Sequence, residues 1–147
     1  MKRKLLPGIM LILMASGCSR DLSKFSQGTW QLVSWRNMWG DTLVEDFPGD
    51  YTGSGLLLIS GKHLISVGRF TKYNSTVVNN YAGATLTIIG NHCEETLLYF
   101  PDQESVGSKV KSILELRNDT LIKTYPCNDK WDIDRSDYII EKYVRLK

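Results

Sequence analysis

The sequence predicts an all-β protein, an eight-stranded antiparallel up-and-down barrel that follows a removable N-terminal segment. Short alternating runs of apolar and polar residues recur along the chain, tight-turn residues separate them, and no segment after residue 27 has the apolar period of a helix. With 147 residues, 42% of them hydrophobic, the chain can bury one core. We therefore expect one domain, in which closure removes the exposed sheet edges.

The N-terminus has the order of a secretion signal. Residues 2–4 are basic, the apolar run 5–14 is too short to span a bilayer comfortably, and small residues at 15–17 precede Cys18. This order resembles a bacterial lipoprotein signal with residues 15–18 as the lipobox. The resemblance implies cleavage before Cys18, a diacylglycerol thioether on its sulfur and acylation of the new amino terminus, which together anchor stably. An ordinary secretory signal is the alternative.

These features divide the chain into a signal peptide (1–17), a lipidated tether (18–27) and a barrel domain (28–147). The tether is polar, and it has neither an aspartate directly after Cys18 nor an acidic run. By similarity to known sorting signals, we expect a protein of the Gram-negative cell envelope. It would be lipid-anchored to the outer membrane and face the periplasm.

The charge balance argues against nucleic-acid binding. The chain has 18 basic and 16 acidic residues, and removal of the three basic residues at 2–4 leaves 15 against 16, a net charge of −1. A near-neutral domain without basic runs lacks the positive surface that nucleic-acid binding requires.

Eight strands are predicted, and tight-turn residues such as Gly90-Asn91 and Asn118-Asp119 separate them. Their ranges are 29–36, 55–60, 63–71, 82–89, 92–100, 109–117, 120–125 and 138–146. The connections 37–52 and 126–137 are longer and contain large aromatic residues, including Trp39 and Trp131. We expect both to pack against the barrel rim. Alternatively, 37–52 folds over a barrel mouth as a lid and 126–137 flanks the same opening or the other one.

Turn geometry predicts which side chains point inward. A two-residue turn at Gly90-Asn91 pairs Leu86 with Glu95 and Ala82 with Tyr99 on the more apolar face. The turn at Asn118-Asp119 likewise places Lys123 on an apolar face, with Tyr125 further along. Two charged side chains, Glu95 and Lys123, therefore lie inside the barrel near the same end, where we expect them to meet as a pair.

Buried charges must pair, remain hydrated or receive a ligand. Glu95, Tyr99, Lys123 and Tyr125 together suggest a pocket with a few polar groups on an apolar wall, as is usual for small-molecule sites. The alternative is a filled interior in which Glu95 and Lys123 satisfy one another.

Short motifs along the chain suggest a family. They are Gly28-Thr29-Trp30 with Leu32-Val33-Ser34, Lys62-His63-Leu64-Ile65 leading to Arg69-Phe70, Tyr81-Ala82-Gly83 to Gly90-Asn91 with Glu95, Val106-Gly107-Ser108-Lys109, Asn118-Asp119-Thr120-Leu121, and Glu141-Lys142-Tyr143-Val144-Arg145. In these motifs the chain resembles the lipocalin-like lipoproteins of Gram-negative bacteria, in the calycin group of barrels.

The resemblance implies an eight-stranded barrel, a large first loop and a cavity for a small hydrophobic ligand. It also implies that Trp30 packs under Arg145 of the last strand and closes one barrel end, a structural role. Cys93, Tyr143 and the loop around Trp131 depart from the family pattern and leave the identity of the ligand open.

The sequence contains no catalytic constellation. His63 and His92 are the two histidines and have no metal-ligand spacing, no nucleophile elbow or phosphate-binding loop is present, and adjacent Glu94 and Glu95 point to opposite faces. We expect no enzyme activity, no metal and no cofactor. Cys93 and Cys127 are expected at opposite barrel ends, roughly 15 to 20 Å apart, and hence as free thiols.

Two functional hypotheses remain. In the first, the membrane-anchored lipoprotein binds or carries a small hydrophobic or amphiphilic molecule in its barrel, with the polar head near Lys123. In the second, a filled barrel serves as a structural lipoprotein that binds an envelope protein through its loops or outer wall. This hypothesis predicts an exposed apolar patch around Trp39, Tyr51 or Trp131.

Overall fold

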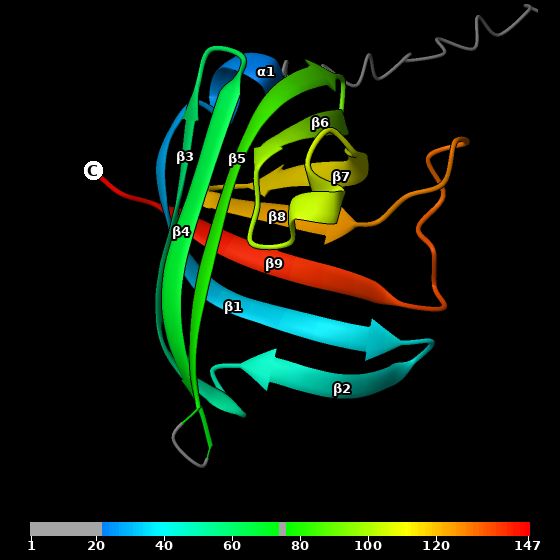
Figure 1. Cartoon of the computed structure of the whole chain (residues 1–147). Helices are drawn as coiled ribbons and strands as arrows, with labels where there is room; N and C mark the ends of the chain where they lie inside the picture. The colour runs from blue at the N-terminus through cyan, green and yellow to red at the C-terminus, as the bar shows by residue number, and fades with distance from the viewer. Residues whose placement is uncertain (1–21, 74–75) are drawn as a thin grey trace, which may run out of the picture.

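The computed structural model describes residues 22–73 and 76–147, and its strands form one antiparallel sheet that closes on itself (Figure 1). The elements are α1 (Leu22–Phe25), β1 (Gly28–Trp39), β2 (Thr42–Phe47), β3 (Tyr51–Ser60), β4 (His63–Lys72), β5 (Val77–Ile89), β6 (His92–Tyr99), the short 3-10 helix η1 (Gln103–Ser105), β7 (Lys109–Arg117), β8 (Thr120–Tyr125) and β9 (Tyr138–Arg145). Strands β3 to β9 follow one another as a meander, and β9 pairs with β1. The predicted eight-stranded antiparallel barrel, made of β1 and β3 to β9, is confirmed.

The barrel closes where its first and last strands meet. Trp30 of β1 lies opposite Arg145 of β9, and pairing continues to Met38 opposite Tyr138. The Trp30 side chain is fully buried, and the Arg145 guanidinium carbon lies 4.1 Å from its ring centroid. The contact that the resemblance implied for these two residues is therefore present at one end of the barrel.

The segment 37–52 is neither a loose loop nor a lid. β1 runs on to Trp39, turns through Gly40 and Asp41, and pairs with β2 along residues 35–39. β3 pairs with the other half of the same β1 edge, at residues 28–31. A ninth strand thus extends the wall at the open end of the barrel (Figure 1), and backbone pairing, rather than rim packing, satisfies its polar groups.

The tight turns set the register of three predicted hairpins. Ser60 pairs with His63, Ile89 with His92, and Arg117 with Thr120, so that each loop has two residues. Gly61, Gly90 and Asn118 have φ values of 60°, 63° and 55° in these loops, the left-handed conformation that primed hairpin turns require. This turn chemistry explains why β7 and β8 have the predicted limits.

Large side chains fill the half of the barrel that Trp30 closes. The buried residues here include Leu57, Ile59, Leu64, Leu86 and Leu121, contributed by strands around the whole circumference. The alternation of buried and exposed residues along β3 and β6 matches a wall with one face in the core.

The folded part begins before Gly28, contrary to the expected tether at 18–27. α1 covers the closed end, where Leu22 and Ser26 are buried and the Trp30 indole N–H donates to the Ser26 carbonyl at 2.7 Å. Within residues 22–73 and 76–147, the helices are too short or too polar to cross a bilayer. The signal segment and Cys18, the expected acylation site, lie outside the described residues.

The connection 126–137 packs on the outer wall instead of flanking an opening. The Trp131 ring stacks on His92 of β6, with centroids 4.2 Å apart and planes 2° from parallel, and the Lys111 ammonium of β7 lies 5.5 Å from the Trp131 centroid. Outward-facing side chains of the barrel thus hold the loop down.

Cys93 and Cys127 are free thiols, but their expected placement at opposite ends is wrong. Cys93 lies opposite Ser112, and the Cys127 amide donates to the carbonyl of Lys111, so only β7 lies between the two cysteines. Because the tilted strands are staggered, the two cysteines are separated by about 10 Å, which is two interstrand spacings. The expected separation was the length of a strand.

We predict that Arg145→Met will lower the free energy of unfolding by about 1.5 to 3 kcal/mol, because Arg145 also donates to the carbonyls of Phe25 and Gln27 and hydrogen bonds to charged groups have this magnitude. Urea unfolding measures the change. The same substitution at Arg117, whose ion pair with Glu115 is exposed, should change it by less than about 1 kcal/mol. Equal losses in the two variants would show that the contact between Trp30 and Arg145 is not special.

Candidate functional site

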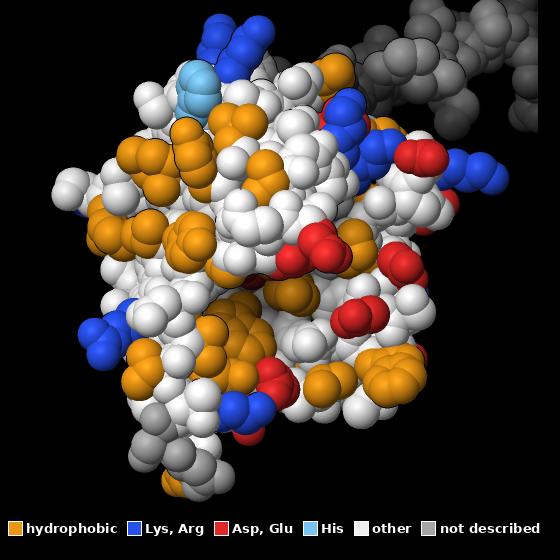
Figure 2. Space-filling view, viewed as in Figure 1, with side chains coloured by type: hydrophobic (Ala, Val, Ile, Leu, Met, Phe, Trp, Pro, Cys, Tyr) orange, Lys and Arg blue, Asp and Glu red, His pale blue; other side chains and the backbone are white. Residues whose placement is uncertain are grey.

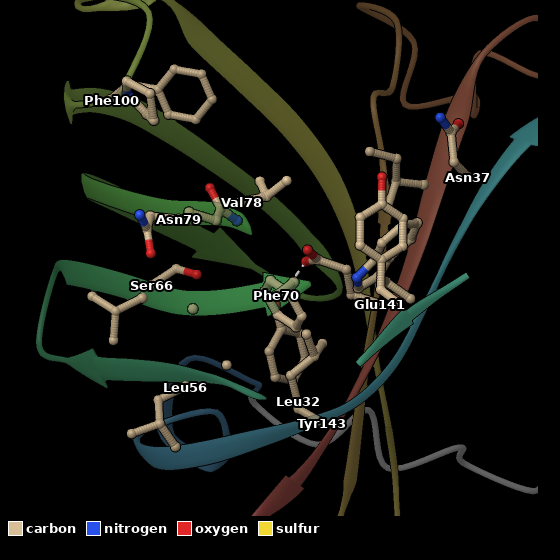
Figure 3. Close-up of a pocket in the computed structure, with 18 of the residues that line it drawn as sticks. Leu32, Asn37, Leu56, Ser66, Phe70, Val78, Asn79, Phe100, Glu141 and Tyr143 are labelled. Atoms are coloured by element: carbon tan, nitrogen blue, oxygen red, sulfur yellow. Dashed lines mark hydrogen bonds between the residues drawn. The ribbon is translucent and has the colours of Figure 1, made fainter. Parts of the chain in front are cut away.

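The open half of the barrel contains a cavity of about 480 Å³. Its wall is formed by residues from β1 to β5, β8 and β9 and by the connection after β6 (Figure 3). Figure 2 shows the hollow on this face of the molecule, with acidic side chains at its border. The barrel is therefore filled in its closed half and hollow in its open half, which combines the two alternatives left by the sequence.

Two facing glycines help to make room on one wall. Gly55 of β3 pairs with Gly68 of β4, and a Cβ on Gly68 would lie 2.5 Å from the Phe70 ring. The ring can rest against this wall because neither strand has a side chain there. Phe70 then contacts Phe47 edge to face at 5.2 Å, and Leu32 and Val78 add further apolar surface.

An ion pair marks the wall nearest the mouth. Glu45 of β2 pairs with the Lys72 ammonium, and the Tyr51 hydroxyl donates to Glu45 at 3.1 Å. The Tyr51 ring also packs against Trp35 at 5.1 Å. The missed strand β2 thus supplies a charged residue to the cavity, already neutralised by its neighbour.

Glu95 and Lys123 meet as predicted, in the interior. The Lys123 ammonium lies 2.7 Å and 3.0 Å from the two Glu95 carboxylate oxygens, and the residues are 8% and 4% exposed. The predicted pairing of Leu86 with Glu95 is confirmed, and Lys123 lies on the predicted apolar face, opposite Leu114. Burial alone would lower the pKa of Lys123, but the carboxylates of Glu95 and Glu141 outweigh burial and hold this pKa above its usual value.

Neither member of this pair lines the cavity. Tyr125 does line it, and the Lys123 ammonium lies 4.6 Å from the centroid of the Tyr125 ring. The Lys123 ammonium already contacts both Glu95 oxygens. The expectation that Lys123 receives the polar head of a ligand does not fit this ion pair. The pair satisfies itself, as the alternative from the sequence held.

Tyr99 points away from the pocket, contrary to the prediction. A bulge in β6 pairs Gly83 with Tyr99 and Ala84 with Leu97, so the alternation shifts by one residue at Leu98. Tyr99 is 70% exposed, and its ring packs over Gly83, where a Cβ would lie 2.9 Å from it. An aromatic ring that covers a glycine in this way is a recurrent partner of strand glycines.

The sequence-based prediction missed Glu141, which lies in the cavity wall. Its carboxylate accepts hydrogen bonds from Tyr125 at 3.1 Å and from Tyr143 at 2.9 Å. In the register of β8 with β9, Glu141 lies directly opposite Lys123. Alternation along β9 is the signal that could have found it, because Ile139 and Tyr143 point to the same side.

Burial, with the charge of Glu141, raises the pKa of both Tyr125 and Tyr143 well above the usual value. Their hydroxyls therefore stay protonated at neutral pH and continue to donate to Glu141. Burial likewise raises the pKa of the Cys93 thiol to about 12. Within the described ranges, 22–73 and 76–147, no three His, Cys, Asp or Glu side chains form a group that could hold a metal ion.

Comparisons with known proteins leave the family open. No protein-family model matches the chain, and no curated protein matches it. Among solved structures, one similar chain is apocrustacyanin C2, with a TM-score of 0.41 and 11% identity over 82% of this chain; the match spans 60% of the crustacyanin chain. The fold assignment rests on the strand pairing described above.

We predict that Glu95→Gln and Lys123→Met will each lower the free energy of unfolding by about 3 to 5 kcal/mol, because each leaves a buried charge without its partner. The double variant should lose at least about 1 kcal/mol less than the sum of the two single losses. Urea unfolding of the four proteins measures this coupling.

A matched control uses the neighbouring exposed pair. Glu94 and Lys109 lie 2.7 Å apart on the outer face, so Glu94→Gln and Lys109→Met should couple by less than about 1 kcal/mol. Similar coupling energies in the two cycles would contradict the assignment of the interior pair as a buried ion pair.

Proposed function

We propose that this protein is a lipid-anchored, lipocalin-like lipoprotein of the Gram-negative envelope, on the outer membrane and facing the periplasm. It binds or carries a small hydrophobic or amphiphilic molecule in the open half of its barrel. The role is one of binding rather than catalysis.

The cavity is the observation that supports this proposal. Its volume of about 480 Å³ lies in the usual range for small-molecule sites, and its wall combines apolar side chains, such as Leu32, Phe70 and Val78, with a few polar groups. The filled half beneath it gives the cavity a rigid floor.

The proposed lipid anchor and cellular location rest on the sequence. Residues 2–18 have the charge, apolar run and small residues of a lipoprotein signal, and acyl chains on Cys18 would hold the barrel at a membrane. The short distance in sequence from Cys18 to α1 fits a domain held close to its anchor.

An envelope-protein partner is a second candidate, supported by the outer wall of β3 to β5. Leu56, Val67 and Tyr81 are consecutive cross-strand partners there, and Leu58 and Ile65 pair in the next row; all five are exposed, and Leu56 and Val67 also border the cavity. Contiguous apolar surface of this kind is typical of interaction sites. Of the residues expected in such a patch, Tyr51 lines the cavity and Trp131 stacks on His92, whereas Trp39 is exposed.

We predict that Ser66→Phe will weaken binding of the apolar dye N-phenyl-1-naphthylamine at least about ten-fold, because Ser66 lines the cavity and a phenyl group there would occupy it. Fluorescence titration of the mature chain measures the effect. The control is Ser54→Phe, which adds the same ring at an exposed position of β3. Unchanged dye binding in Ser66→Phe would count against the cavity as the binding site and favour the outer wall.

We predict that Cys18→Ser will abolish incorporation of labelled palmitate. The variant should either appear in the soluble fraction or keep its uncleaved signal segment. Cys127→Ser, a thiol within the barrel domain, should leave both properties unchanged. Palmitate labelling of Cys18→Ser at the normal level would contradict the proposed anchor.

A further inference from the structure

We propose that the cavity selects a cationic ligand, an ammonium group on an apolar body, and that the Glu141 carboxylate is its anchor. This inference rests on the proposed binding function and names the ligand class. It replaces the first expectation, in which the polar head of the ligand would lie near Lys123.

Two carboxylates, Glu95 and Glu141, lie next to the ammonium of Lys123 in the interior. Glu95 and Lys123 neutralise each other, while Glu141 receives two neutral hydroxyls. Within residues 22–73 and 76–147, Glu141 forms no ion pair. A partly buried carboxylate at a cavity wall gains most from a cation that brings its own donors.

The two tyrosines leave Glu141 free to accept more. A carboxylate offers about four lone-pair positions, and Tyr125 and Tyr143 each use one, on different oxygens. Their donated bonds hold the carboxylate in one orientation, so that its remaining lone pairs are pre-organised. Phe70 and Val78 also line the cavity and offer apolar surface to the body of such a ligand (Figure 3).

The other carboxylates of the wall offer a cation less than Glu141 does. Glu45 is paired with Lys72. Asp102, like Glu141, accepts one hydrogen bond on each oxygen, but it is exposed at the start of η1, where solvent screens its charge. In the described part of the chain, the residues that line the cavity include three carboxylates, those of Glu45, Asp102 and Glu141, and no Lys or Arg. An anionic head would find no positive partner there.

Asn37 gives independent support for a ligand with donors. Its side-chain oxygen is buried and has no hydrogen-bond partner, and the residue lines the cavity on β1, adjacent to β9. Buried acceptors in proteins almost always have a donor. A ligand N–H could satisfy this oxygen, whereas a carboxylate or a hydrocarbon could not.

Three ligands with the same ten-carbon chain test the inference: decylamine, decanol and decanoate, titrated calorimetrically below their micelle concentrations into the mature chain, residues 18–147. Decylamine should bind at least about ten-fold more tightly than decanol, and decanoate most weakly. In Glu141→Gln the preference for the amine should fall below about three-fold, while decanol affinity stays the same. Glu94→Gln, which removes a carboxylate paired with Lys109 on the outer face of the barrel, should keep the preference.

The outcomes separate the inference from the function beneath it. Equal binding of the three ligands, or a preference for decanoate, would overturn the cationic selectivity and leave the binding function intact. Absence of binding by all three would remove both. The ranking of the three affinities in the unmodified protein tests the cationic selectivity, so the test does not depend on whether Glu141→Gln folds. The melting temperature of Glu141→Gln shows whether its affinities can be compared with those of the unmodified protein.

A fourth ligand distinguishes a free amine from a lipid headgroup. Single-chain phosphatidylethanolamine carries an ammonium beside a phosphate, and the wall offers that phosphate no Lys or Arg among its described residues. We therefore expect it to bind more weakly than decylamine. Tighter binding than decylamine, lost in Glu141→Gln, would assign the ammonium to a lipid; tighter binding that survives the substitution would contradict Glu141 as the anchor.

Discussion

The contact between the first and last strands is the constraint on which the rest of the structure depends. Trp30 is enclosed by α1, by the β9 partner strand and by the Arg145 side chain, which also ties down the carbonyls of Phe25 and Gln27. A cation over the face of a tryptophan contributes about 0.5 to 1 kcal/mol at an exposed site and more as it is desolvated, in addition to the apolar area that the ring buries. Without this closure the sheet would have two long exposed edges, and neither the core nor the cavity would have a complete wall.

The polar interior separates the filled half of the barrel from the hollow half. Glu95 and Lys123 lie among apolar side chains, with Tyr125, Glu141 and Tyr143 between them and the open space. Apolar residues of similar volume would stabilise the fold as well or better than an ion pair. The polar residues instead give the cavity floor a fixed pattern of charge, which an apolar floor could not provide.

Prediction from sequence succeeded where local chemistry determines the geometry. Gly90-Asn91 and Asn118-Asp119 allow only short hairpins, so the register of β5 with β6 and of β7 with β8 followed by counting, and with it the meeting of Glu95 and Lys123. Prediction failed at Tyr99 because the bulge at Leu98 is a backbone irregularity with no residue signature. It failed for β2 because Thr42–Phe47 alternates poorly and precedes a proline.

The cavity itself was harder to predict because long-range register forms it. Glu141 faces Lys123 only through the pairing of β8 with β9, and the twelve residues 126–137 between these strands are too many for that register to follow by counting across a two-residue turn. Similarly, the space beside Phe70 depends on Gly55 lying opposite Gly68. Each residue is ordinary in its own strand, and the cavity depends on how the strands are aligned.

The position of α1 has a consequence for how a bound molecule could enter and leave. Cys18 precedes Leu22 by four residues, which span at most about 14 Å when extended, and α1 lies at the closed end of the barrel. Under the proposed acylation, the bilayer would therefore face the plugged end, and the mouth would open toward the aqueous compartment. Cargo would be exchanged with the surrounding fluid or with a passing carrier, and lateral transfer from the lipid beneath would have no direct path.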